Sequence, residues 1–243
     1  MWRFLAIICA LLPLPALAEQ VLVAVASNFV RPAEALVRVF EAESGHKIEL
    51  ASGSTGQHFA QIVHGAPYDV FLAADQVRPA RLVEMGLASN AFTYAYGRLA
   101  LISHSFDLMG SEQEYVSEIK FIAIANPETA PYGRAAEQVL QLPELDLLSG
   151  ATVVQGQNVG QAFAFVASGT ADLGLVALSQ AQDADFEYFI LEPELHDPIR
   201  QDAVLLAHGA DNLAAREFLA YLASDAAQEM IVSFGYDAPV GRE

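Results

Sequence analysis

Short runs of consecutive apolar residues recur along this 243-residue chain and alternate with helical patterns. Val21–Ala26, Val70–Ala74 and Phe121–Ala125 are apolar throughout, as is typical of strands buried on both faces of a parallel sheet. Between such runs lie segments such as Ala33–Glu43, whose apolar residues fall on one helical stripe. Strands that alternate with helices in this way predict an α/β fold with doubly wound sheets.

Residues 1–18 have the organisation of a secretory signal peptide. A short basic start precedes the apolar run Phe4–Leu14, and Ala16–Ala18 fits the small-residue pattern of a cleavage site. The apolar run is too short to span a membrane. We therefore expect an exported, periplasmic protein that is cleaved after Ala18 and does not insert into the membrane. Cys9, the only cysteine, lies in the leader, so no disulfide or thiol chemistry is expected in the mature chain.

The remaining chain is long enough for one large α/β domain or two small ones. The alternation of strands and helices is interrupted once and then resumes, so we expect two doubly wound α/β lobes joined by a two-crossing hinge. The crossings are expected near Tyr96–Leu99 and His196–Gln201. Residues 19–96 plus 203–243 would form lobe 1, and residues 97–202 would form lobe 2.

The chain is strongly acidic. It has 12 lysines and arginines against 30 acidic residues, and loss of Arg3 with the leader changes the formal net charge from −18 to −19. Such a surface repels nucleic acid and anionic membranes, so neither is expected as a partner. It also repels a free anion until salt screens the field, within about 10 Å. An anionic ligand would therefore need local hydrogen-bond donors.

Such donors are expected where strands lead into helices. Four of these turns combine hydroxyl or amide side chains with a helix start and contain no lysine or arginine: Ser27-Asn28, Ser54-Thr55, Tyr132-Gly133 and Asn158-Val159. Free backbone N–H groups and the helix dipole suit a helix start to anion binding. Two turns fall in each expected lobe, and ligands of open α/β sheets lie beyond the carboxyl ends of strands. Four independent N-caps are the alternative interpretation.

At these residues the chain resembles the periplasmic molybdate-binding proteins of ABC importers, which are type II solute-binding proteins related to sulfate-binding ones. The most specific segment is ASGSTGQHFAQIVHGAPYDVFLAAD, and weaker ones are AVASNF, IAIANPETAPYGRAA, NVGQAFAFVASGTADLGLV and AAREFLAYLASDAAQEMIVSFGY. The resemblance implies the type II periplasmic binding protein fold. It also implies a monomeric, non-enzymatic receptor that captures molybdate or tungstate and delivers it to a membrane ABC permease.

By position, the resemblance places oxyanion contacts on Ser27 and Thr55, through hydroxyl and backbone N–H. Tyr132 and Val159 would contribute mainly backbone N–H groups, and Asn28 would add a donor. Molybdenum would then be held as its oxyanion, with no direct protein–metal ligand and no cofactor. The complete expected ligand-binding set is Ser27, Asn28, Ser54, Thr55, Tyr132, Asn158 and Val159.

Two positions depart from the family pattern. One branch of the family has a tyrosine hydroxyl where this chain has Ala177, and leucine is common where this chain has His58. We therefore expect the chain to belong to the branch that uses Asn28 and Tyr132. Protonated His58, close to the expected site, is hypothesised to strengthen anion binding.

Neutral donors favour some ligands over others. Molybdate is a dianion that donates no hydrogen bond, whereas partly protonated phosphate requires an acceptor. Sulfate is smaller than molybdate, and tungstate is nearly the same size. Another tetrahedral oxyanion, such as sulfate or chromate, remains an alternative, but a carboxylate usually recruits an arginine. An enzyme on the same two-lobed fold, as in the porphobilinogen deaminases, would need a cofactor-bearing cysteine that the mature chain lacks.

Other chemistry-bearing residues predict no catalytic or metal site. The six histidines form no HExxH or Cys/His motif, and we expect them on the surface. Asp69 and Asp75 flank a strand and are expected to lie too far apart for glycoside hydrolysis. No serine lies in a G-x-S-x-G elbow.

Overall fold

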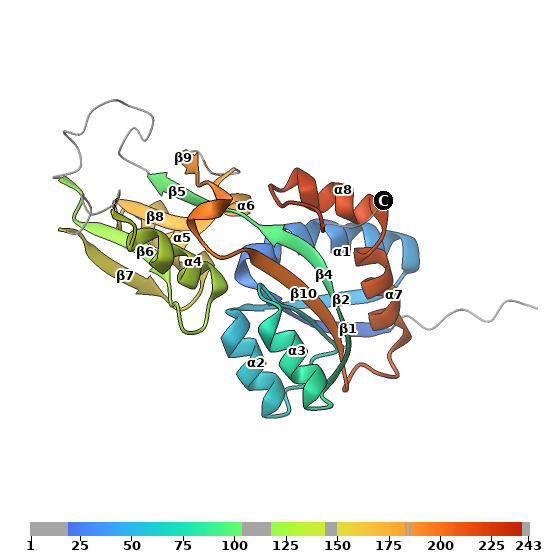
Figure 1. The fold of residues 1–243 in the computed structure, drawn as a ribbon. Coiled ribbons are helices and arrows are strands. Elements are labelled where there is room, and N and C mark those ends of the chain that lie inside the picture. The colour runs from blue at the N-terminus through green and yellow to red at the C-terminus, as the bar shows by residue number, and fades with distance from the viewer. Residues whose placement is uncertain (1–18, 104–117, 144–149, 183, 185, 240–243) are drawn as a thin grey trace, which may run out of the picture.

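The computed structural model describes residues 19–103, 118–143, 150–182, 184 and 186–239 (Figure 1). The expected leader, and Cys9 with it, lies outside these residues. The described chain forms two five-stranded sheets, and each sheet has helices packed on it. No helix in the described ranges combines the length and the hydropathy that crossing a membrane requires.

The first sheet and its helices are here called lobe 1. Its strand order is β2-β1-β3-β10-β4. The strands are β1 (Gln20–Ala26), β2 (Lys47–Gly53), β3 (Val70–Leu72), β4 (Ala88–Gly97) and β10 (Ile199–Leu206). The helices are α1 (Val30–Ser44), α2 (Thr55–Val63), α3 (Val77–Glu84), α7 (Leu213–Leu222) and α8 (Asp225–Ser233).

Helices cover both faces of the lobe 1 sheet, because successive side chains of a strand point to opposite faces. On β1, Val21, Val23 and Val25 pack in one apolar cluster with residues of α1, α7 and α8. Ala24 belongs to a second cluster that includes residues of α2 and α3. Figure 1 shows these two helix layers on opposite sides of the sheet. The doubly wound arrangement expected from the apolar runs is confirmed.

The second sheet and its helices are called lobe 2. Its strand order is β7-β6-β8-β5-β9. The strands are β5 (Leu99–Ser103), β6 (Phe121–Ala125), β7 (Thr152–Gly156), β8 (Leu173–Ala177) and β9 (Glu187–Ile190). The helices are α4 (Pro131–Leu140), α5 (Val159–Ala167) and α6 (Leu178–Ala181). One apolar cluster, which includes residues of α4, α5 and α6, forms the core of this lobe.

Both sheets are mixed rather than wholly parallel. In lobe 1, β10 runs antiparallel to β3 and β4, and in lobe 2, β5 runs antiparallel to β8 and β9. Both β5 and β10 follow a crossing between the lobes. An antiparallel strand needs no crossover helix. A chain that passes directly from one lobe to the other can therefore enter the second sheet antiparallel to the strands beside it.

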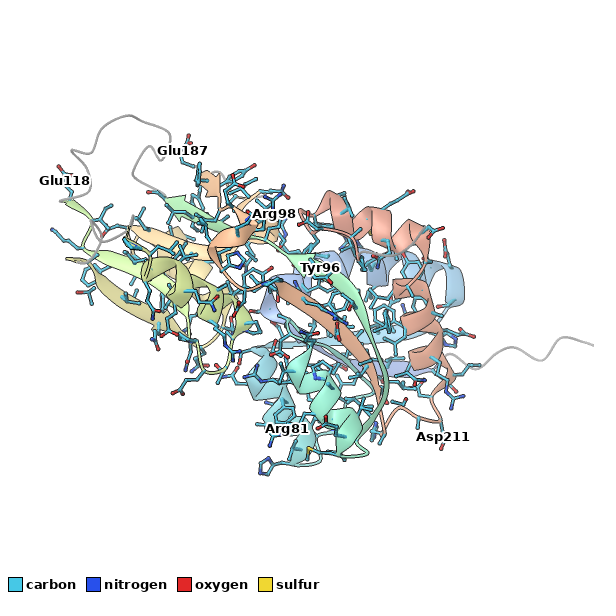
Figure 2. The ribbon with its side chains drawn as sticks, in the orientation of Figure 1. Arg81, Tyr96, Arg98, Glu118, Glu187 and Asp211 are labelled. Carbon is cyan, nitrogen blue, oxygen red and sulfur yellow. The ribbon has the colours of Figure 1, made fainter. Side chains whose placement is uncertain are left out.

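The hinge contains two such crossings. Only Arg98 separates β4 from β5, and Tyr96 and Arg98 mark this crossing in Figure 2. On the return, β10 begins at Ile199 and pairs with Gly97 of β4. The expected lobe boundary at residue 203 therefore falls inside a strand. The segment IRQDAVLL lacks the continuous apolar pattern that predicts a buried strand, because Gln201 and Asp202 are polar. Both residues are nevertheless buried.

Candidate functional site

The four expected turns come together between the lobes. They line one small cavity of about 190 Å³, including the part open to solvent, and all seven residues of the expected ligand-binding set are among its walls. The wall residues are Ala26, Ser27, Asn28, Gly53, Ser54, Thr55, Ala74, Ala130, Pro131, Tyr132, Asn158 and Val159. None of them carries a charged side chain. The role of the seven expected residues as anion contacts stays a prediction. Their hydrogen bonds differ: some cap a helix, and others leave a donor at the cavity.

In the turn before α2, Ser54 is an N-cap and Thr55 faces the cavity with a free donor. Ser54 and Gln57 form a capping box: the Ser54 Oγ accepts from the Gln57 N–H at 3.2 Å, and the Ser54 N–H donates to the Gln57 Oε1 at 3.2 Å. The Thr55 Oγ1 accepts from the Ala74 N–H at 3.0 Å, so its own hydrogen is left to donate. The Thr55 N–H has no acceptor among the described residues.

The next N–H of α2 is used between the lobes. Gly56 donates to the Thr129 carbonyl at 2.8 Å. A Cβ on Gly56 would lie 2.9 Å from that oxygen and from the Thr129 Cα, so only glycine allows this approach. The glycine that ends the SGSTG segment is therefore explained by contact between the lobes.

The turns of lobe 2 each leave one donor without a protein partner. Pro131 occupies the first position of α4 and has no N–H, and the N–H groups of Gly133 and Arg134 both donate to the Ala130 carbonyl. The N–H of Tyr132 is left, with no acceptor among the described residues.

In α5, the Asn158 Oδ1 caps the helix by accepting from the Gln161 N–H at 3.0 Å. The Gly160 N–H donates across the cleft to the Ser27 Oγ at 3.3 Å. The Val159 N–H, between them, has no acceptor in the described chain. As in α4, one first-turn donor is therefore left at the cavity.

Asn28 does not turn its side chain toward the cavity. It is 2% exposed, and its amide nitrogen donates to the Gln201 Oε1 at 2.8 Å and to the Tyr236 hydroxyl at 3.1 Å. Both amide hydrogens are thus used in the interior, and the expected side-chain donor is not available to a ligand. Sequence reasoning missed Gln201 and Tyr236. The only signal for Gln201 was a glutamine inside a segment that is otherwise compatible with a buried strand.

His58 lies beside the cavity without lining it. Its Nε2 lies 3.2 Å from the Val25 carbonyl and its Nδ1 lies 3.3 Å from the Gln61 Oε1. Burial lowers the pKa of His58, which favours the neutral imidazole. The expectation that all histidines lie on the surface is wrong for His58 and for His46, which are 3% and 7% exposed. His104 lies outside the described residues.

Asp69 and Asp75 are occupied by separate structural partners. Asp69 accepts from the Leu22 N–H and contacts the His208 imidazole, while Asp75 is paired with Arg78. Ala177 is fully buried at the end of β8 and is not part of the cavity wall. Within the described ranges, no group of three or more histidine, cysteine and acidic residues is placed to hold a metal ion.

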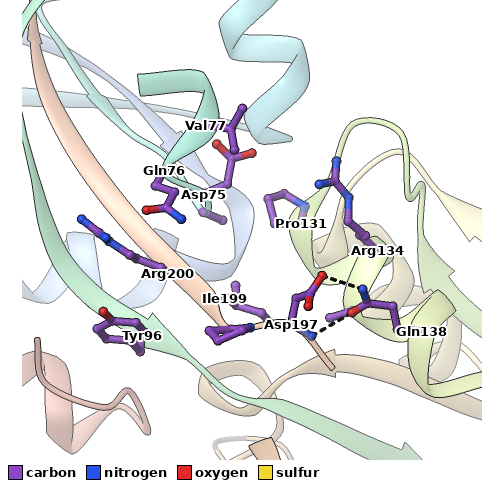
Figure 3. Close-up of a pocket in the computed structure, with 13 residues that line it drawn as sticks. Asp75, Gln76, Val77, Tyr96, Pro131, Arg134, Gln138, Asp197, Ile199 and Arg200 are labelled. Atoms are coloured by element: carbon purple, nitrogen blue, oxygen red, sulfur yellow. Dashed lines mark hydrogen bonds between the residues drawn. The ribbon is translucent and has the colours of Figure 1, made fainter. Parts of the chain in front are cut away.

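A larger cavity of about 1000 Å³, again including the part open to solvent, adjoins the small one, with which it shares Ala74 and Pro131. Figure 3 shows Arg200 and Arg134 on opposite sides of this space. Asp197, also in its wall, accepts from the Gln138 amide at 2.7 Å, and Asp75 is held by Arg78. Arg200 is paired with Asp202 at 3.3 Å, and the remaining wall charges, on Arg134 and Asp197, are opposite in sign. This larger space therefore has no excess positive charge.

Comparison with known proteins agrees with this architecture. Residues 21–237 match the family model of the bacterial extracellular solute-binding proteins. The chain is 42% identical to the molybdate-binding protein ModA of Azotobacter vinelandii over 234 residues, and 39% identical to ModA of Rhodobacter capsulatus over 229 residues. The first match covers 93% of each chain, and the second covers 93% of this chain and 91% of its relative.

A solved structure extends the likeness to three dimensions. The periplasmic molybdate-binding protein of Azotobacter vinelandii superposes with a TM-score of 0.83 at 36% identity, covering 90% of this chain and 99% of that one. The order of strands and helices, the match over residues 21–237 and these relatives lead to one conclusion. The chain belongs to the family of bacterial extracellular solute-binding proteins.

Proposed function

We propose that this protein binds molybdate, and tungstate about equally well, in the small cavity between its lobes. The observation that carries the proposal is the neutral cavity wall, in which the backbone N–H groups of Thr55, Tyr132 and Val159 have no acceptor among the described residues. Relatives that are 42% and 39% identical over nearly the whole chain are named molybdate-binding proteins.

The donor set suits an ion that accepts hydrogen bonds and donates none. Three backbone N–H groups and the hydroxyls of Ser27 and Thr55 surround the cavity from both lobes. Each charge-assisted hydrogen bond contributes about 1.5–3 kcal/mol, so several together can replace the hydration of a dianion. The wall has no carboxylate to accept a proton from hydrogen phosphate, which disfavours that ligand.

The wider biological role follows from the family. We propose that the protein is exported, with cleavage after Ala18, and works in the periplasm as a monomer. It would pass its bound oxyanion to a membrane ABC permease, without a resident cofactor and without catalysing a reaction. The small volume of the cavity and the absence of charged side chains among its described wall residues favour such a carrier over an enzyme.

The test is isothermal titration of the purified mature protein with molybdate, tungstate, sulfate, phosphate and chromate. We expect submicromolar binding of molybdate and tungstate, and far weaker binding of sulfate and phosphate. Strong binding of sulfate or chromate would reassign the cavity to another oxyanion. Absence of heat with all five anions would contradict the proposal.

A further inference from the structure

Behind the small cavity lies a buried set of hydroxyl and amide groups that touch one another across the two lobes. Lobe 1 and the chain after α8 supply four of them, and lobe 2 supplies two. We call this set the polar cluster. Its hydrogen-bonded members are Asn28, Tyr94, Gln201, Tyr236 and Ser179. The sixth member is Tyr132, whose buried hydroxyl has no hydrogen-bond partner among the described residues. All six side chains are at most 3% exposed.

The backbone carbonyl of Asn28 accepts hydrogen bonds from residues of both lobes. It accepts from the Tyr236 hydroxyl at 2.8 Å and from the Ser179 hydroxyl at 3.0 Å. The two hydroxyls also lie 3.0 Å from each other. Ser179 belongs to α6 of lobe 2, whereas Asn28 belongs to the turn after β1 in lobe 1. This contact therefore requires the lobes to be together.

The same turn forms one wall of the anion cavity. Ser27 and Asn28 line that cavity, and the side-chain amide of Asn28 donates hydrogen bonds to Gln201 and Tyr236. Gln201 is itself held, because its Oε1 also accepts from the Tyr94 hydroxyl at 3.0 Å. Burial raises the pKa of Tyr94, Tyr132 and Tyr236, so these hydroxyls keep their protons at neutral pH.

One other hydrogen bond between the lobes reaches the same turn, from the Gly160 N–H to the Ser27 Oγ at 3.3 Å, whereas two more do not. Gly56 donates to the Thr129 carbonyl, and the Arg78 guanidinium donates to the Glu128 carbonyl at 2.9 Å. Neither bond touches the Ser27-Asn28 turn. The Ser179 hydroxyl thus joins lobe closure to one of the elements that line the anion cavity.

Resting on the proposed function, we propose that Ser179 and Tyr236 are positioning residues for anion retention. They fix the Ser27-Asn28 turn through the Asn28 carbonyl, and Ser179 does so only when the lobes are closed. The anion touches neither side chain. Loss of the Ser179 hydroxyl should therefore release the anion faster while leaving the open protein, and the capture of the anion by it, unchanged.

The decisive experiment compares the mature wild-type protein with Ser179→Ala in stopped-flow binding of molybdate. Tyrosine fluorescence is the signal, because Trp2, the only tryptophan, lies in the leader. We expect the dissociation rate constant to rise roughly 3- to 10-fold, as for loss of one net hydrogen bond, with the association rate constant unchanged. The melting temperature without anion should not change, because the open protein lacks this contact.

Two further variants sharpen the result. Tyr236→Phe should also raise the dissociation rate, and it removes a bond within lobe 1, so its melting temperature without anion should fall as well. Ser233→Ala is the matched control: its exposed hydroxyl bonds only the Met230 carbonyl in α8, and both rates should equal those of the wild type.

The outcomes separate the two proposals. An unchanged dissociation rate in Ser179→Ala, or a rise matched by a lower melting temperature without anion, would overturn the positioning role. In either case wild-type binding of molybdate would still support the proposed function. If the wild type binds sulfate or chromate instead, the same comparison with that anion tests the positioning role. Failure of the wild type to bind any of the five anions would refute both.

Discussion

At the scale of single residues, Gly97 shows how little space the closed hinge leaves. A Cβ on this residue would lie 2.2 Å from the Tyr132 hydroxyl and 2.8 Å from the Gln201 Nε2. Tyr132 belongs to lobe 2 and Gln201 to lobe 1, so the ring of Tyr132 reaches from the anion cavity into the hinge. A side chain as small as a methyl group at residue 97 would push these lobes apart.

We therefore expect Gly97→Ala to weaken molybdate binding by about 5-fold or more. The added methyl group disfavours the closed state by roughly 1–3 kcal/mol, as overpacking does in a close-packed interior. Isothermal titration measures the affinity, and small-angle scattering with saturating anion measures closure. Gly150→Ala is the control, since no described residue lies within 4 Å of its Cβ position. Equal affinities of the two variants would contradict the expectation.

At the scale of elements, His58 ties helix α2 to strand β1. Its ring lies against the Val25 carbonyl one turn after Thr55, where it holds the start of α2 beside the end of β1. Because the lowered pKa keeps this ring neutral, His58 has a structural role that the hypothesis of an anion-binding imidazolium did not include. We therefore expect His58→Gln, which cannot take up a proton, to bind molybdate with the same affinity as the wild type.

The lowered pKa of His58 gives a pH prediction. The unfolded chain takes up this proton near pH 6.5, while the folded protein does so only at lower pH. The contribution of His58 to stability is therefore complete above about pH 6.5 and is lost as the pH falls toward the folded pKa. Urea unfolding at pH 7.5, 6.5 and 5.5 should show a smaller loss in His58→Gln than in the wild type. His64→Gln, which changes an exposed ring at the C-cap of the same helix, is the control and should keep the wild-type slope. Identical slopes for all three proteins would refute this assignment.

At the scale of the whole molecule, residues of both lobes line the small cavity. An anion that binds donors from both lobes stabilises the closed, folded protein by mass action. A concentration 1000-fold above Kd contributes about 4.1 kcal/mol, which corresponds to a rise in Tm of roughly 8–16 °C for a protein of this size. Calorimetry with molybdate should show this rise. Sulfate at the same concentration should give little change, and an equal rise with sulfate would contradict the proposed selectivity.

Features that depend on residues close together in the sequence could be predicted from the sequence. Continuous apolar runs predicted the buried strands, and the alternation with helical stripes predicted doubly wound lobes. Hydroxyl and amide residues at the four turns pointed to one cavity, because helix starts after parallel strands collect at one edge of each sheet. Within these turns, Ser54 and Asn158 proved to be caps, since their oxygens bind their own helices.

Which hydrogen-bonding groups remain available to a ligand depends on contacts between segments distant in the sequence. The Asn28 amide turns inward because Gln201 and Tyr236, distant in sequence, offer it acceptors, and His58 is buried because Val25 lies beneath it. Strand β10 holds Gln201 and Asp202 in the interior because Thr93 and Tyr94 of β4 donate to the Asp202 carboxylate and to the Gln201 Oε1. No local pattern encodes such pairings: their energies arise only when segments distant in the sequence meet and exclude water.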